Sequence, residues 1–245
     1  RVAQAVQTPA SAGAMASQRR YLNLHEYQCK NLLREAGCNV QQFEVASTPD
    51  EAAQIAERMG VKENVVKAMV LAGGRGKGTF SNGFQGGVHV LDSNPDDVRE
   101  LAKNMLGYNL VTKQTTAEGV PVNKLMVAES LDIDHETYFA IVLDRESNGA
   151  VMVGSPEGGV DIEEVAESNP DAIFKEVIDI NTGVTDEQAA RMAKNLQFTK
   201  GNEGEVAAEQ FKKLYELFAK VDAVQVEINP FANTKDGRVV CFDAK

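Results

Sequence analysis

A glycine-rich run with two basic residues is the first feature of this sequence that could do chemistry: Gly73-Gly74-Arg75-Gly76-Lys77-Gly78. It follows an apolar stretch, residues 65–72, that is predicted to form a strand. Glycines let a backbone adopt positive φ and approach a ligand closely. Successive N–H groups in such a loop can face an anion. Together with the charges of Arg75 and Lys77, this predicts a loop that holds phosphates.

Lys67 lies inside the apolar stretch that precedes the loop. A lysine in a buried strand is costly unless its ammonium group reaches water or an anion. One interpretation is a phosphate-binding lysine beside the glycine loop. The other is an edge-strand lysine that extends into solvent. The loop itself has a second interpretation too, as a mobile surface loop without a ligand.

The glycine loop matches neither of the two common phosphate-loop motifs. A Walker A motif requires glycine at the position of Leu71 and serine or threonine at the position of Gly78. A dinucleotide fingerprint requires glycine at the position of Thr79. The residues after the loop resemble a hairpin rather than a helix. A loop between two strands is predicted to act as a flap over a nucleotide.

A second group of polar residues lies at the other end of the sequence. Glu227 and Asn229 are two residues apart, so they share one face of a predicted strand, and Asp243 lies near the end of its partner strand. Their oxygens could bind one hard cation such as Mg²⁺, which needs few protein ligands when phosphates supply the rest. The alternative is turn chemistry, because Asn before Pro often opens a loop.

No nucleophile is evident. The histidines and cysteines are scattered and show neither a nucleophile pair nor the spacing of a zinc site; they are His25, His89, His135, Cys29, Cys38 and Cys241. Each is expected to be structural. The net charge of −11 argues against a general nucleic-acid binder. No apolar run approaches the roughly 20 residues that would span a bilayer.

Residues 1–20 differ in composition from the rest of the chain. They contain three arginines and no acidic residue, and the first carboxylate is that of Glu26. Arginine without acid is typical of a mitochondrial transit peptide. The alternative is a flexible tail or a cloning remnant. Either interpretation excludes this segment from the fold.

Helices and strands alternate along the remaining chain without a steady βαβ period. Capping signals predict helices that begin at Thr48, Asn94, Asp161 and Thr185. Turn signals at Asn148-Gly149 and Asp236-Gly237 predict antiparallel hairpins. Further helices are predicted at 25–36 and 206–220, and strands at 39–46, 65–72, 87–91, 125–128, 138–143, 150–153, 224–228 and 238–242. This pattern favours an α+β fold over a doubly wound parallel sheet.

These features together resemble the β subunits of succinate–CoA ligase (succinyl-CoA synthetase), whose N-terminal part is an ATP-grasp domain. The matching stretches follow the family's order from about Tyr21 onward: 23–28, 72–78, 112–115, 154–164, 227–230 and 243–245. The resemblance implies two α/β subdomains with the nucleotide between them. It places residues 41–120 in the smaller one, and residues 21–40 and 121–245 in the other.

The resemblance also implies the role of each matching residue. The positions that match nucleotide-binding ones are Gln41, Lys67, Gly74, Arg75, Gly76, Leu131 and Glu136. Asn229 and Asp243 match Mg²⁺ ligands, and Glu227 is a possible catalytic residue that orients the phosphoryl group. Gln41 matches a base-contacting position, and its amide could serve either adenine or guanine.

In this family, ATP or GTP phosphorylates a histidine of the α subunit in the mitochondrial matrix. The phosphoryl group then passes to succinate, and CoA displaces it as part of the tricarboxylic acid cycle. The resemblance therefore implies an α-subunit partner, which would explain the missing nucleophile. The second domain of the family would begin where this chain stops, so we expect nucleotide binding without ligase activity alone. The alternatives are a malate- or citrate-CoA ligase subunit and a non-catalytic scaffold.

Overall fold

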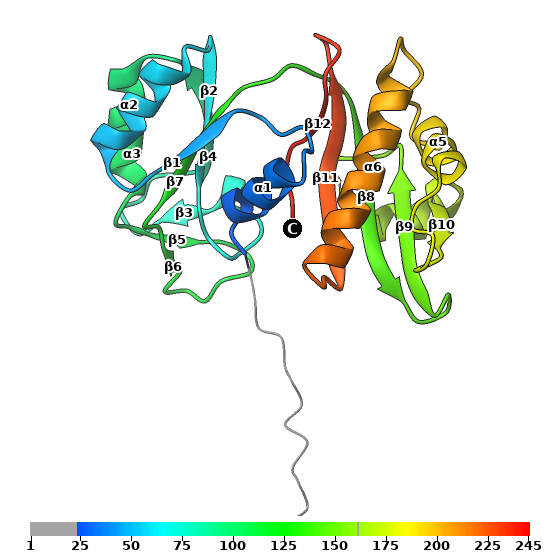
Figure 1. Cartoon of the computed structure of the whole chain (residues 1–245). Coiled ribbons are helices and arrows are strands. Elements are labelled where there is room, and N and C mark those ends of the chain that lie inside the picture. Colours follow the sequence, from blue (N-terminus) through cyan, green and yellow to red (C-terminus); the bar gives the residue numbers. More distant parts are fainter. Residues whose placement is uncertain (1–23, 161) are drawn as a thin grey trace, which may run out of the picture.

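The computed structural model describes residues 24–160 and 162–245, so the predictions for residues 1–20 and for Asp161 as a cap lie outside it. The described chain forms two lobes, each built on an antiparallel sheet. Helix α1 (Glu26–Glu35) and the last residues of the chain lie between the lobes (Figure 1). The prediction of an α+β fold is confirmed.

The first lobe consists of a four-stranded sheet in the order β1-β7-β2-β4, with α2 and α3 packed together beside it (Figure 1). Its elements are β1 (Phe43–Ala46), α2 (Pro49–Met59), β2 (Glu63–Ala68), β4 (Val88–Asp92), α3 (Pro95–Met105) and β7 (Leu125–Glu129). A small third sheet contains β3 (Thr79–Phe80), β5 (Asn109–Val111) and β6 (Val120–Pro121). The glycine loop therefore lies between β2 and β3, at one end of the larger sheet.

The sheet of the first lobe includes a strand that follows the predicted division at about residue 120. Strand β7 pairs with both β1 and β2, with Val127 opposite Glu44 on one side and Val66 on the other. Because β7 is the central partner of this lobe, the chain leaves the lobe only after Glu129. Sequence pattern showed the strand but not its partners, which are long-range.

The second lobe consists of a five-stranded sheet in the order β10-β9-β8-β11-β12, with α5 and α6 packed against it (Figure 1). Its elements are β8 (Ile133–Asp144), β9 (Gly149–Ser155), α4 (Ile162–Ser168), β10 (Phe174–Ile178), α5 (Asp186–Asn195), α6 (Glu203–Lys220), β11 (Gln225–Thr234) and β12 (Val239–Cys241). A 3₁₀ turn covers Pro170–Ala172. Strand β11 carries Glu227 and Asn229 beside the central strand β8.

Helix α6 supplies the core of this lobe through one apolar face. The ring of Phe211 stacks on that of Phe139 from β8, with centroids 4.2 Å apart, and Phe231 of β11 lies against both. Leu33 of α1 belongs to the same buried cluster. Helix α1 is therefore part of the second lobe, although it precedes the first lobe in the sequence.

Several helix ends follow the predicted capping residues. The hydroxyl of Thr48 accepts from the Glu51 N–H at 3.2 Å, and Gly60 ends α2 with φ of 62°. Thr185 and Gln188 form the predicted reciprocal pair at α5. The carboxylate of Glu51 accepts a hydrogen bond from the Ser47 N–H, whereas a capping box would have it accept from the Thr48 N–H.

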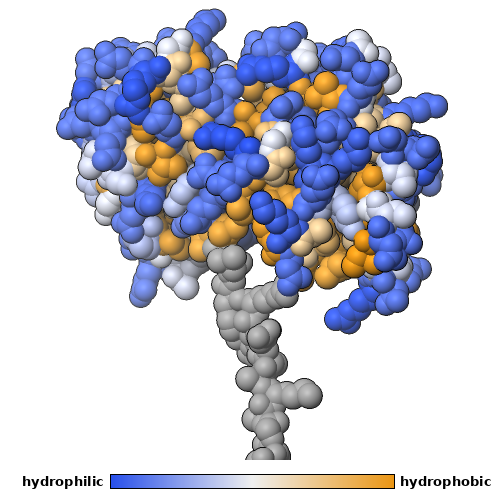
Figure 2. All heavy atoms as spheres, viewed as in Figure 1, coloured by the Kyte–Doolittle hydropathy of each residue, from blue (hydrophilic) through white to orange (hydrophobic). Residues whose placement is uncertain are grey.

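The strand predictions at 39–46 and 65–72 extend too far. Strand β1 begins only at Phe43, and β2 ends at Ala68. The face shown in Figure 2 is mainly hydrophilic, with apolar atoms between the polar side chains. Within the described ranges, we find no helix long and apolar enough for a membrane crossing.

Candidate nucleotide-phosphate site

The two basic side chains predicted to bind phosphates meet at one buried carboxylate. Glu26, in the first turn of α1, accepts a hydrogen bond from Lys67 Nζ at Oε1, at 3.0 Å. Arg75 Nη2 donates to the other oxygen, Oε2. The side chain of Glu26 is 3% exposed, against 14% for Lys67 and 16% for Arg75. The strand, the glycine loop and α1 thus converge on one carboxyl group.

A third cation, Lys30, lies one helical turn farther along α1 and is fully buried. Its ammonium group is 3.7 Å from Glu26 Oε1 and donates to Gln41 Oε1 at 2.7 Å. Burial, with the nearby charge of Lys67, lowers the pKa of Lys30 to about 8, and Glu26 opposes this shift. For Glu26 itself, burial favours a higher pKa. The charges of Lys67, Arg75 and Lys30 outweigh it and hold that pKa below its usual range.

The glycine loop is folded tightly against the start of β4. Gly74 has φ of 73° and leads into a 3₁₀ turn at Arg75–Lys77. The Arg75 carbonyl accepts from the Gly87 N–H at 2.8 Å, and a Cβ on Gly87 would lie 2.9 Å from that same oxygen. A side chain at Gly87 would push the loop away, so this glycine keeps Arg75 close to the sheet.

Asn229 and Asp243 lie side by side because the Asn229 N–H donates to the Asp243 carbonyl at 2.9 Å. The side-chain oxygen of Asn229 accepts from Gly159 N–H at 2.8 Å, and its amide nitrogen donates to Val160 at 3.0 Å. Burial, followed by repulsion from Glu26, raises the pKa of the Asp243 carboxyl; Arg75, Lys67 and Lys245 oppose the shift. The predicted metal ligands and phosphate-binding cations thus share one electrostatic environment.

The donor set at Asn229 and Asp243 fits Mg²⁺. An amide oxygen and a carboxylate are hard oxygen donors, and Mg²⁺ usually takes one or two carboxylates and completes its shell with phosphates and water. Burial raises the pKa of the Asp243 carboxyl, and a divalent cation bound there would favour its ionised form. In the part of the chain that the structure describes, no three His, Cys, Asp or Glu side chains gather as a metal cage.

Glu227 lies next to this pair on β11 and faces Lys245, whose ammonium group is 2.8 Å from Oε1. Its Oε2 accepts from Gln225 at 3.0 Å and lies 3.4 Å from the Tyr138 hydroxyl. Burial, with the charge of Glu227, raises the pKa of that hydroxyl, so Tyr138 stays protonated. Polar neighbours therefore hold the Glu227 carboxyl in place, and its side chain is 14% exposed.

Glu136 and Leu131 lie beside the Asn229 end of the site. A Cβ on Gly159 would lie 1.9 Å from Glu136 Oε2, so the carboxylate fits here only because this residue is a glycine. The N–H of Gly159 donates to the Asn229 side chain, and Glu136 therefore lies close to Asn229. Leu131 packs on a small apolar cluster that includes Phe242, the neighbour of Asp243. The structure thus brings Lys67, Arg75 and Asp243 into one charged environment and places Glu136 close to Asn229.

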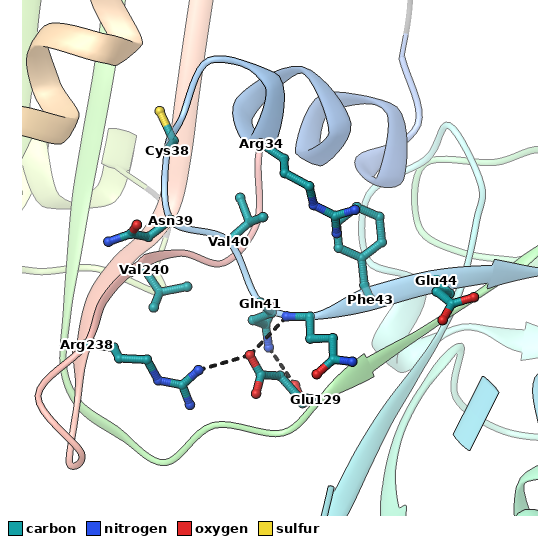
Figure 3. Close-up of a pocket in the computed structure, with 11 residues that line it drawn as sticks. Arg34, Cys38, Asn39, Val40, Gln41, Phe43, Glu44, Glu129, Arg238 and Val240 are labelled. Carbon is teal, nitrogen blue, oxygen red and sulfur yellow. Dashed lines mark hydrogen bonds and ion pairs between the residues drawn. The ribbon is translucent and has the colours of Figure 1, made fainter. Parts of the chain in front are cut away.

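Both polar atoms of the Gln41 side chain have partners within the protein. Its side chain is buried: Oε1 accepts from Lys30, and Nε2 donates to the Glu129 carbonyl at 2.9 Å. It lines a groove of about 820 Å³ where the two lobes join, together with Phe43, Glu129 and Arg238 (Figure 3). None of the other predicted site residues lines this groove. Gln41 therefore connects the groove to the charged cluster through Lys30.

Sequence reasoning missed Glu26 and Lys30 as site residues. A signal was available, because Glu26, Lys30 and Leu33 share the buried stripe of an amphipathic helix. Charged residues on such a stripe are almost never fully buried unless they are paired. The partners came from β2 and from the glycine loop, which the helical period alone does not indicate.

Comparison with known proteins identifies the family to which this fold belongs. Residues 23–233 match the family model described as an ATP-grasp domain. The chain belongs to the ATP-grasp family. A solved structure with 16% identity supports the fold alone: an acetyl-coenzyme A synthetase of Ca. Korarchaeum cryptofilum, in complex with coenzyme A and with a phosphohistidine segment. It aligns with a TM-score of 0.64 over 90% of this ATP-grasp chain and 91% of that chain.

Curated relatives of this ATP-grasp chain include mitochondrial succinate–CoA ligase β subunits. The pig subunit, named GDP-forming, is 62% identical over 93% of this chain and 52% of its own length. The subunit of Dictyostelium discoideum named ADP-forming is 52% identical over 96% of this chain and 52% of its own length. The chain spans about half the length of the curated relatives it matches.

Proposed function

We propose that this chain is the nucleotide-binding part of a succinate–CoA ligase β subunit. The observation that carries the proposal is the convergence of Lys67 and Arg75 with Asp243, which joins cations and a carboxylate in one buried environment between the lobes. A nucleoside triphosphate needs both kinds of group, cations for its phosphates and oxygens for its Mg²⁺. The similarity to β subunits named GDP-forming and ADP-forming supports the same assignment.

The proposed roles follow from the chemistry of each group. Lys67 and Arg75 would neutralise phosphate charge, and the backbone of Gly74 and Gly76 would approach the phosphates without steric hindrance. Asn229 and Asp243 would hold Mg²⁺, which would neutralise part of the phosphate charge. These groups supply positioning and charge neutralisation, the main protein contribution to phosphoryl transfer.

The remaining predicted residues would hold the nucleoside and orient the transferring group. Gln41 would contact the base by exchanging a bond to Lys30 or Glu129 for one to the base, with Leu131 and Glu136 beside the base or ribose. Glu227, with its carboxylate next to the metal pair, would orient the phosphoryl group toward its acceptor. Two lobes that close on the nucleotide would exclude water, which strengthens every ionic contact inside the site.

The proposal includes a partner and a location. The acceptor would be a histidine of an α subunit, from which the phosphoryl group passes to succinate before CoA displaces it. The reverse direction would form ATP or GTP from succinyl-CoA, phosphate and ADP or GDP. The relatives are named as mitochondrial, which supports a place in the mitochondrial matrix for this chain as well.

Calorimetry with Mg-GTP and Mg-ATP on the chain of 245 residues tests the proposal. We expect saturable binding of at least one nucleotide, and a loss of at least about tenfold in affinity for Lys67→Met, because a charge-assisted phosphate contact disappears. Lys62→Met is the matched control, since Lys62 is exposed five positions earlier, just before β2. A folded chain that binds neither nucleotide would overturn the proposal.

A further inference from the structure

The contacts of Glu26 are those of a residue that positions the side chains of the phosphate site. Its carboxylate is the point where side chains from three segments meet: Lys30 from its own helix, Lys67 from β2, and Arg75 from the glycine loop. Neither the family resemblance nor the proposed roles assigns Glu26 a function. The Glu26 side chain is nevertheless more buried than those of Lys67 and Arg75, which were predicted to bind phosphate, and it is the group that both of them contact.

The three cations would repel one another without this carboxylate. Lys67 is close enough to Lys30 to disfavour the charge of the buried ammonium group. Like charges in a poorly hydrated environment repel far more strongly than in water. Glu26 gives each oxygen to a different cation: Oε1 to Lys67, and Oε2 to Arg75. It therefore allows two cations that are expected to bind one ligand to stay close together before the ligand arrives.

Glu26 also joins the two lobes at this place. It belongs to α1, whose Leu33 packs in the core of the second lobe, whereas Arg75 and Lys67 belong to the first. The backbone of the loop is bonded to its own lobe, through Arg75 and Gly87. The carboxylate of Glu26 is thus the link between the loop's arginine and the opposite lobe.

The contacts leave the cations able to bind a ligand. Glu26 accepts one hydrogen bond from Lys67 and one from Arg75. Ammonium and guanidinium groups have further N–H donors beyond one bond each. The same arrangement works in protein kinases, where a helix glutamate holds the strand lysine that contacts the phosphates.

We propose that Glu26 is a positioning residue of the phosphate site, which holds Lys67 and Arg75 together and fixes the glycine loop against α1. The proposal rests on the proposed function, because it assumes that these two cations bind the nucleotide phosphates. The alternative is that the Glu26 carboxylate competes with phosphate for the two cations. That alternative predicts that removal of the carboxylate charge raises the affinity for nucleotide.

The test is nucleotide binding by Glu26→Gln, a substitution of nearly equal size without the charge. We expect Mg-nucleotide affinity to fall by at least about tenfold, because the two cations lose their common anchor. Glu35→Gln is the matched control: it lies on the same helix, it is exposed, and it is expected to bind like the unsubstituted chain.

Limited trypsin digestion provides a readout that a general loss of stability would not give. Without nucleotide, cleavage after Arg75 and Lys77 is expected to accelerate in Glu26→Gln at temperatures where its far-ultraviolet circular dichroism is unchanged. Cleavage at Lys103, the exposed lysine of α3, serves as the internal reference. Equal cleavage of the loop in both chains would contradict the anchoring of the loop.

The outcomes separate this inference from the proposed function. If the unsubstituted chain binds no nucleotide, the proposed function fails first. If it binds and Glu26→Gln binds equally well or more tightly, the positioning role alone is overturned. Should Glu26→Gln fail to fold, Glu26→Asp takes its place. This variant keeps the charge but shortens the reach, and it too must bind more weakly than the Glu35→Gln control.

Discussion

Single residues in this chain show how burial and charge act against each other. Glu26 remains ionised in a buried position because cations surround it, whereas burial raises the pKa of the Asp243 carboxyl. Both are carboxylates near the same cations, and they differ in whether a cation makes direct contact. Distance to a partner therefore decides the charge state of a buried acid more than burial alone does.

The cysteines give a pH prediction at the same scale. Burial, with the charges of Asp243 and Glu26, raises the pKa of the Cys29 thiol to about 11, and burial raises that of Cys38 to about 11. The thiolate is the reactive form, so alkylation of the folded chain should keep rising up to about pH 11. Mass spectrometry after brief iodoacetamide pulses at stepped pH measures this rise.

The urea-unfolded chain is the control for the cysteines. There the thiols have ordinary pKa values, and alkylation should level off above about pH 9. A plateau near that pH in the folded chain would contradict the raised values.

Among the elements, α6 shows what the sequence could predict and what it could not. Its apolar period was visible, and the helix begins three residues earlier than predicted, at Glu203. Its partners were not visible: Phe211 stacks on Phe139, which is 72 positions away in the sequence, and packs at a tilt against Phe231. A helical period indicates which face is buried but not against which strand.

The aromatic stack gives a stability prediction for this element. Phe211→Ala should lower the free energy of unfolding by about 3–5 kcal/mol, because it removes a fully buried ring and leaves a cavity. Glu216→Ala, an exposed site on the same helix, should change it by less than about 0.5 kcal/mol. Urea unfolding followed by circular dichroism compares the two, and a loss below about 1 kcal/mol for Phe211→Ala would show that the core relaxes around the gap.

Helix ends were the most predictable part of the fold, since the signals for them are local. Thr48 and Thr185 cap helices through bonds to residues three positions later. Strand ends were less predictable because they depend on distant partners: β8 begins at Ile133, where it pairs with Thr234. The site followed the same rule. Its glycine loop was visible, whereas the carboxylate of Glu26 that gathers its cations was not.

For the whole molecule, the division of the site between two lobes predicts coupled protection. On binding Mg-nucleotide, amides of residues 73–78 and of residues 227–229 should both exchange more slowly, because the ligand contacts both lobes. Hydrogen exchange read by mass spectrometry measures both segments together. Without Mg²⁺, protection at 227–229 should be lost to a greater extent, since the metal would contact only that side.

Amides of α3 are the internal control for this measurement, because the helix lies on the outer side of the first lobe (Figure 1). They should change little on binding. Protection confined to one lobe would mean that the ligand does not lie between the two.

The path of the chain between the lobes also bears on how the protein is made. Helix α1 leaves the ribosome before the first lobe, yet its surroundings come much later: the N–H of Asn39, four residues after the helix, donates to Gln210, 171 positions further on. The first lobe can complete its sheet during synthesis, while α1 still lacks the core in which Leu33 is buried. Helix α1 is therefore made before the first lobe but can dock fully only after α6 has been made, and Leu33 has no core to pack in until then.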